Sequence, residues 1–133
     1  MITFPEIQSL IYEYGAKINA PINLLRIFDS PQSDGTPYIK ITDDSYFYIV
    51  EERGCEFERL QTDDLDVLCY WLMKNVVFNI SIKYELEHRI ESQDFRKILF
   101  FKQLQLFGCL NPKWLQIRQA EIYEILKKSP YVN

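Results

Sequence analysis

The chain has 133 residues, of which 47% are hydrophobic, and a formal net charge of -4 at pH 7. This length and composition predict a single globular domain over residues 1–133 with a full hydrophobic core. The acidic balance argues against nucleic acid as a partner. We also expect no membrane span, because Lys74 and Asn75 interrupt the longest apolar run before it reaches about 18 residues.

The charge is unevenly distributed. Residues 38–66 contain nine acids and three bases, a sum of -6, whereas residues 67–133 contain six acids and ten bases, a sum of +4. Such asymmetry indicates a surface for a partner more than it indicates a fold. The three cysteines, Cys55, Cys69 and Cys109, lack a C-x-x-C spacing. Together with an N-terminus that does not resemble a signal peptide, they favour a reducing, cytoplasmic location.

In chain order, apolar spacing first predicts an amphipathic helix over residues 5–18. A loop rich in proline and aspartate follows, with one helical turn near residues 23–26. Alternating aromatic and β-branched residues then predict three antiparallel strands over residues 38–42, 46–52 and 55–60.

The turn between the second and third strands sets which side chains share a face. A two-residue turn at Arg53-Gly54 would place Glu51 opposite Glu56, an unfavourable pair of like charges. We therefore predict a three-residue loop that aligns Ile49 with Phe57. In this register the face turned toward the helices carries Phe47, Ile49, Cys55 and Phe57. The opposite face carries Tyr46, Tyr48, Val50, Glu56 and Glu58.

The remainder of the chain is predicted to be helical. Residues 62–90 are apolar almost all round and form the central helix, either as one bent helix or as two short ones. Residues 94–108 form a further helix that Gly108 is expected to stop. Asn111-Pro112, a capping residue followed by proline, starts the last helix. The fold class is therefore α+β, with an N-terminal helix, a three-stranded meander, and three or four C-terminal helices on one sheet face.

No motif indicates a catalytic centre, a metal site or a cofactor. The single histidine, His88, lies in a charged helix end with no local nucleophile. Asp63, Asp64 and Asp66 are placed to bind Mg²⁺ or simply to provide negative charge at a helix start, and the second explanation is the commoner one. A second charged group is read either as surface pairs or as a buried ion network; it comprises Glu85, Arg89, Glu91, Asp94 and Arg96.

The acidic strand region is the best candidate for a protein-binding surface. Tyrosine rings supply contact area and carboxylates steer a basic partner toward them. An ordinary solvated sheet face explains the same residues about as well, because tyrosine also favours strands. The candidate partner-binding residues are Tyr46, Tyr48, Glu56, Glu58, Asp63 and Asp64.

Several combined pieces of the sequence resemble the Immunity protein 63 family. They lie between about Glu51 and Tyr131 and include Glu52-Arg53-Gly54, Thr62 with Asp64 and Asp66, Tyr70-Trp71, Tyr84-Glu85-Leu86, Arg89, Gln93-Asp94, Arg96, Gln103, Pro112 and Trp114. The resemblance implies a small cytoplasmic protein that neutralises a cognate toxin domain in bacterial polymorphic or contact-dependent toxin systems, without catalytic residues. Two alternatives stay open at this point: a general interaction or scaffold domain, and a small metal-dependent enzyme that uses Asp63, Asp64 and Asp66.

Overall fold

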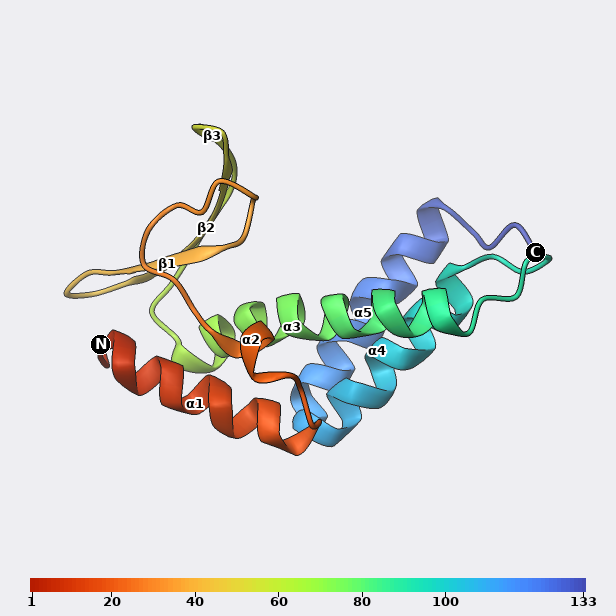
Figure 1. Ribbon diagram of the computed structural model, residues 1–133, viewed down its shortest axis with the longest axis horizontal. Coiled ribbons are helices and arrows are strands. Elements are labelled where there is room, and N and C mark those ends of the chain that lie inside the picture. Colours follow the sequence, from red (N-terminus) through yellow and green to blue (C-terminus); the bar gives the residue numbers. More distant parts are fainter. The chain divides into compact units, whose positions relative to one another are not determined.

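A computed structural model describes all 133 residues. The elements follow the predicted order: α1 (Phe4–Lys17), α2 (Ile22–Leu25), β1 (Tyr38–Ile41), β2 (Tyr46–Glu52), β3 (Cys55–Thr62), α3 (Leu65–Glu87), α4 (Arg96–Leu110) and α5 (Pro112–Lys128). The α+β class, the N-terminal helix, the antiparallel meander and the C-terminal helices are thereby confirmed (Figure 1).

The chain divides into two compact units. The first comprises residues 1–16 and 21–74, and the second comprises residues 17–20 and 75–133. The helix α3 belongs to both, since it contributes its first ten residues to the first unit and the rest to the second. The prediction of one domain over the whole chain stays a prediction.

The first unit contains α1, α2, the sheet and the start of α3 (Figure 1), and it has an apolar core of its own. Its buried side chains include Ile7 and Ile11 of α1, Ile39 of β1 and Leu68 of α3. Gln8 of α1 ties the following segment to the helix, because its amide donates to the Leu25 carbonyl (2.8 Å) and accepts from the Ile27 N–H (2.8 Å).

The sheet has the order β1-β2-β3 with both pairs antiparallel. The observed turn between β2 and β3 contains only Arg53 and Gly54, both with positive φ (53° and 77°). Glu51 lies opposite Glu56, and Ile49 lies opposite Arg59, with an irregularity between Val50 and Glu51. The predicted three-residue loop is therefore wrong. The bulge places Phe57 between the pairs Glu51–Glu56 and Val50–Glu58 as an extra residue without a partner of its own.

The helix α3 is a single helix of 23 residues, so the β-branched stretch after Asn75 does not break it. By length and composition it also meets the criterion for a membrane span, contrary to our expectation that Lys74 and Asn75 interrupt the run. A core helix passes the same test. Met73 in the first unit and Val77 and Ser81 in the second are fully buried, as expected of a core helix.

In the second unit, the rest of α3, α4 and α5 provide the core residues, among which Phe107 and Trp114 are fully buried. The start of α5 is as predicted: the Asn111 side chain accepts hydrogen bonds from Lys113 N (2.9 Å) and Trp114 N (3.4 Å), and Pro112 is the first helical residue. Gly108 does not end α4, which continues to Leu110 and is followed directly by the cap of α5.

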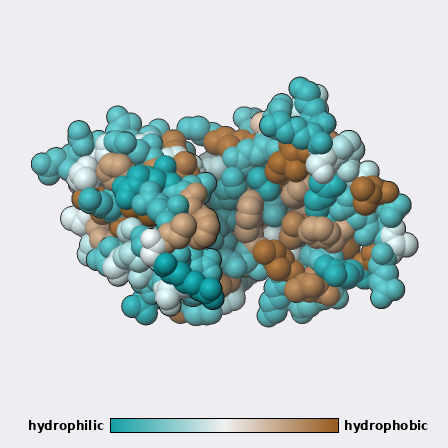
Figure 2. Space-filling view, turned by 90° about the horizontal axis from the view of Figure 1, so that it is seen from above, coloured by the Kyte–Doolittle hydropathy of each residue, from teal (hydrophilic) through white to brown (hydrophobic).

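Hydrophilic side chains predominate on the face shown in Figure 2, and hydrophobic ones form small separate groups.

Candidate protein-binding surface

The two predicted tyrosines point into the first unit. Tyr46 and Tyr48 are only 2% and 7% exposed. The Tyr48 ring lies 6.1 Å from the Trp71 ring of α3, and the Tyr46 hydroxyl accepts a hydrogen bond from Ile2 N (3.0 Å). The prediction that this face is open to solvent is wrong for both residues.

The physical reason lies in β1. Ile39 is opposite Tyr48 and Ile41 is opposite Tyr46, so the two isoleucines share a sheet face with the tyrosines. On the other side of β2, Leu60 of β3 is also opposite Tyr48. This face is therefore the more continuous apolar one, and burial of the Tyr48 hydroxyl raises its pKa far above the ordinary value for tyrosine.

The strand β3, in contrast, is exposed along most of its length. Every residue from Cys55 to Arg59 is exposed, and the Phe57 side chain retains 66% of its accessible surface. Phe57 lies between two glutamates, Glu56 and Glu58, and is one of several large apolar side chains that the chain exposes; its ring would contribute a large favourable energy if a partner buried it. The bulge explains the exposure: it removes Phe57 from the alternation that would have turned it toward the core.

The like charges that we expected to forbid this register are compensated. Arg59 binds Glu56 through two hydrogen bonds (2.8 and 3.2 Å), and this interaction lowers the pKa of the Glu56 carboxyl. The Tyr38 hydroxyl donates to Glu51 (3.2 Å) from the neighbouring strand β1. Each carboxylate of the Glu51–Glu56 pair thus has its own hydrogen-bond donor.

Asp63 and Asp64 are both exposed, in the turn between β3 and α3. The Asp64 carboxylate accepts hydrogen bonds from the main-chain N–H groups of Asp66 (2.8 Å) and Val67 (3.4 Å), so it caps α3. The Thr62 hydroxyl accepts a hydrogen bond from Asp64 N in the same turn (3.0 Å). No group of three His, Cys, Asp or Glu side chains is arranged to hold a metal ion anywhere in residues 1–133.

We define the β3 surface as the exposed residues of β3 and the turn after it that carry this pattern: Glu56, Phe57, Glu58, Asp63 and Asp64. Four of the six predicted partner-binding residues belong to it. Sequence reasoning missed Phe57 as a surface residue because regular alternation assigns it to the core face. The signal available was Gly54, because glycine readily adopts the positive φ that a two-residue hairpin turn requires.

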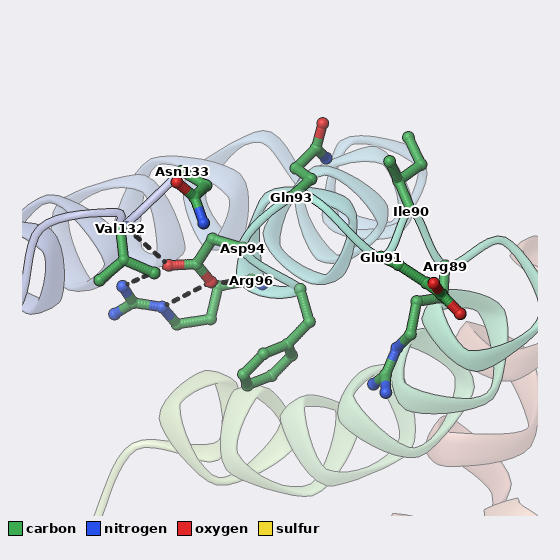
Figure 3. A pocket seen from close by; sticks show the side chains of 9 residues that line it. Arg89, Ile90, Glu91, Gln93, Asp94, Arg96, Val132 and Asn133 are labelled. Atoms are coloured by element: carbon green, nitrogen blue, oxygen red, sulfur yellow. Dashed lines mark hydrogen bonds and ion pairs between the residues drawn. The ribbon is translucent and has the colours of Figure 1, made fainter.

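The second charged cluster consists of two separate ion pairs. Glu85 lies in the last turn of α3 and is 3% exposed; it accepts two hydrogen bonds from Arg89, just beyond the end of the helix (3.0 and 2.7 Å). Asp94 binds Arg96 (2.9 and 3.2 Å) and accepts from Val132 N (3.2 Å), while Arg96 donates to the carbonyls of Ser129 and Pro130. Figure 3 shows Asp94 between Arg96 and Val132, with Arg89 across a pocket of about 390 Å³. The second pair fastens the C-terminal segment.

Arg118 is a buried polar residue that the sequence did not single out as such. It is 4% exposed; its guanidinium lies over the Phe78 ring (4.6 Å) and donates to Gln103 (3.0 Å) and Glu121 (3.1 Å). Gln103 in turn donates to Ser81 (3.3 Å). The signal available in the sequence for the burial of Arg118 was its helical spacing with the apolar residues Trp114 and Ile122. The network joins α3, α4 and α5 and serves the fold.

His88 is exposed, stacked on the Tyr84 ring at 4.0 Å, with Nδ1 2.8 Å from the Tyr84 carbonyl oxygen. Neither Cys nor Ser is among its contacts, so the histidine behaves as a surface residue.

The comparison with known families decides the class of the protein. Residues 43–124 match the Immunity protein 63 family. The chain belongs to this family. The match covers more than half of the chain and extends from the turn before β2 into α5, so it includes the β3 surface and both ion pairs. No curated protein and no solved structure matches the chain. Membership of Immunity protein 63 supports an immunity function and a protein partner, and it favours a non-enzymatic role.

Proposed function

We propose that this member of Immunity protein 63 binds a cognate bacterial toxin domain in the cytoplasm and neutralises it by protein–protein contact. The observation that carries the proposal is the β3 surface. It presents an exposed aromatic side chain, Phe57, between the carboxylates of Glu56 and Glu58, with those of Asp63 and Asp64 beyond the other end of the strand. A central aromatic contact with charged residues around it is the usual composition of a strong protein interface.

The charge of this surface indicates the chemistry of the partner. Residues 55–64 contain four acids and one base, a sum of -3, and the one base, Arg59, is already paired with Glu56. Glu58 is exposed and carries no such ion pair. A basic toxin surface fits this pattern, because complementary potentials accelerate encounter and fix orientation. Many toxins that cleave nucleic acids are basic, which makes a nuclease domain a suitable partner.

The free thiols support the proposed cytoplasmic setting. Cys55, Cys69 and Cys109 are all free, and two of them are exposed. Free exposed thiols persist in a reducing compartment, which agrees with neutralisation of a toxin that has entered the cytoplasm. We place the protein in a polymorphic or contact-dependent toxin system on this basis and on its family.

The test uses the toxin domain encoded by the reading frame adjacent to this gene, in an inactivated form, with binding measured by calorimetry at several salt concentrations. We expect Phe57→Ala to weaken binding by about 2 kcal/mol, or about thirtyfold. The double variant Glu56→Gln/Glu58→Gln is expected to lower the affinity and to flatten its salt dependence. Glu58→Gln alone should account for most of that change, since Glu56 is paired with Arg59.

The matched control is Glu124→Gln, which removes an exposed carboxylate from α5 in the second unit. It should leave the affinity unchanged. If the triple variant at Glu56, Phe57 and Glu58 is folded and binds the toxin with unchanged affinity and salt dependence, the β3 surface is not the docking site. If the toxin domain does not bind the unmodified protein and co-expression does not rescue growth, the neutralising function itself is wrong.

A further inference from the structure

One edge of the sheet is open. The strand β3 pairs only with β2, and no hydrogen bond joins its main chain to a loop or to another element. The opposite edge, at β1, is shorter and partly covered, because Ile39 N donates to the carbonyl of Phe28 (2.9 Å). β3 is the last strand of the sheet in Figure 1, and it is exposed from Cys55 to Arg59.

An open edge of this kind normally carries features that prevent pairing with a second copy. In β3 these features are the carboxylates of Glu56 and Glu58 and the bulge at Phe57. Pairing of two copies through β3 would bring together two strands that each carry a charge of -1 over residues 55–62, or -3 when Asp63 and Asp64 of the following turn are included, which is unfavourable. The same carboxylates attract a strand that carries lysine or arginine. These features therefore disfavour pairing of β3 with β3 of a second copy, while a basic segment can still pair with this edge.

The geometry suits a short strand. Beyond the bulge, Glu58 to Thr62 pair one to one with Val50 to Tyr46, so this part of β3 is regular. Five residues in this conformation span about 17 Å and offer main-chain groups along the free edge. Strand addition of this kind obtains affinity from main-chain hydrogen bonds and specificity from alternate side chains.

We propose that the toxin contributes an extended, basic segment that pairs with the free edge of β3 as a fourth strand of the sheet, with an apolar side chain against Phe57. This inference rests on the proposed function and adds the mode of binding to it. The occupant is a strand of the partner, and the alternative occupant, a second copy of this chain, is one outcome of the test.

Hydrogen–deuterium exchange resolved to single amides distinguishes the outcomes, with the inactivated toxin domain as the probe. In the free protein, the edge-facing amides of residues 58–62 should exchange rapidly. In the complex, we expect alternate amides of this segment to be protected at least tenfold. Toxin binding without such protection would overturn strand addition and leave the proposed function intact; absence of binding would overturn both. A dimer of the free protein with β3 already protected would identify a second copy as the occupant and contradict the proposal.

Proline provides a test that leaves the acidic side chains in place. Successive N–H groups of a strand point to opposite edges, so one of Leu60→Pro and Gln61→Pro removes an edge-facing donor and the other removes a donor to β2. The edge-facing variant should retain the fold by circular dichroism and bind the toxin at least tenfold more weakly. Leu60→Ala and Gln61→Ala are the matched controls. Equal affinity of the folded proline variant and its alanine control would refute strand addition.

Discussion

The rings of Tyr48 and Trp71 lie 6.1 Å apart at an interplanar angle of 56°, and this contact joins β2 to the start of α3. Tyr48 is 7% exposed, so it acts within the core of the first unit. The consequence for function is that the aromatic part of the β3 surface comes from Phe57, which the bulge turns outward.

Substitutions at Tyr48 and Phe57 should affect different quantities: stability at Tyr48, and toxin binding at Phe57. We expect Tyr48→Ala to lower the free energy of unfolding by about 3–5 kcal/mol, because it removes a buried ring, and Tyr48→Phe to change it by less than about 1 kcal/mol. Phe57→Ala should change stability by less than about 0.5 kcal/mol while weakening toxin binding. Urea denaturation and calorimetry measure the two quantities. A large stability loss in Phe57→Ala would show that the side chain serves the fold.

The buried network around Arg118 is expected to be sensitive to loss of its charge. Arg118→Met retains the aliphatic bulk but leaves Gln103 without its donor, and we expect it to destabilise the protein by about 2–3 kcal/mol. Arg59→Met, which removes an exposed ion pair on β3, is the control and should lower the stability far less than Arg118→Met does. In a double-mutant cycle, Arg118 and Gln103 should show a coupling energy of about 0.5–3 kcal/mol. Additive effects would indicate that the two side chains do not support one another.

The Asp94–Arg96 pair predicts a pH dependence of stability. Hydrogen bonds from the Arg96 side chain and from the main-chain N–H groups of Arg96 and Val132 hold the pKa of Asp94 far below its ordinary value. Because the folded-state pKa is the lower one, this contribution is complete above the unfolded value of about 3.9 and is lost as the pH falls through the folded pKa.

Urea midpoints between pH 2 and 7 therefore provide the measurement. Asp94→Asn should be less stable than the unmodified protein at neutral pH, and the difference should shrink as the solution becomes more acidic. Asp43→Asn, at an exposed turn position, is the control. A difference between Asp94→Asn and the unmodified protein that is constant over the whole pH range would contradict the prediction.

Local signals in the sequence predicted more of the fold than of the candidate site. The Asn111-Pro112 start of α5 depends only on neighbouring residues, and it is correct. The turn at Arg53-Gly54 places Glu51 opposite Glu56, and the repulsion between them is offset by hydrogen bonds from Arg59 and Tyr38. These two donors lie elsewhere in the sheet, so the residues of the turn do not reveal them. The burial of Tyr48 depends on the isoleucines of β1 on the same face, and the exposure of Phe57 depends on the bulge; both are pairings between strands that a local pattern does not give.

Two helical glycines, finally, should respond in opposite directions to alanine. In α1, a Cβ on Gly15 would lie 2.3 and 2.5 Å from the two Cδ atoms of the buried Leu25, so Leu25 must move. In α4, a Cβ on Gly108 would meet only Leu115, at an ordinary 3.7 Å. Alanine is favoured over glycine in a helix by about 1 kcal/mol, and this gain is fully available only at Gly108.

We therefore expect Gly108→Ala to raise the free energy of unfolding by about 0.5–1 kcal/mol. Gly15→Ala should lower it by about 1–2 kcal/mol, because overpacking costs more than the helix propensity returns. Thermal and urea unfolding of both variants measure these changes. The double variant Gly15→Ala/Leu25→Ala separates the steric cause from a requirement for glycine itself: if Leu25 is the obstacle, Gly15→Ala should be harmless or stabilising once Leu25 is truncated. A loss of the same size in both backgrounds would show that contact with Leu25 is not the reason for glycine at this position.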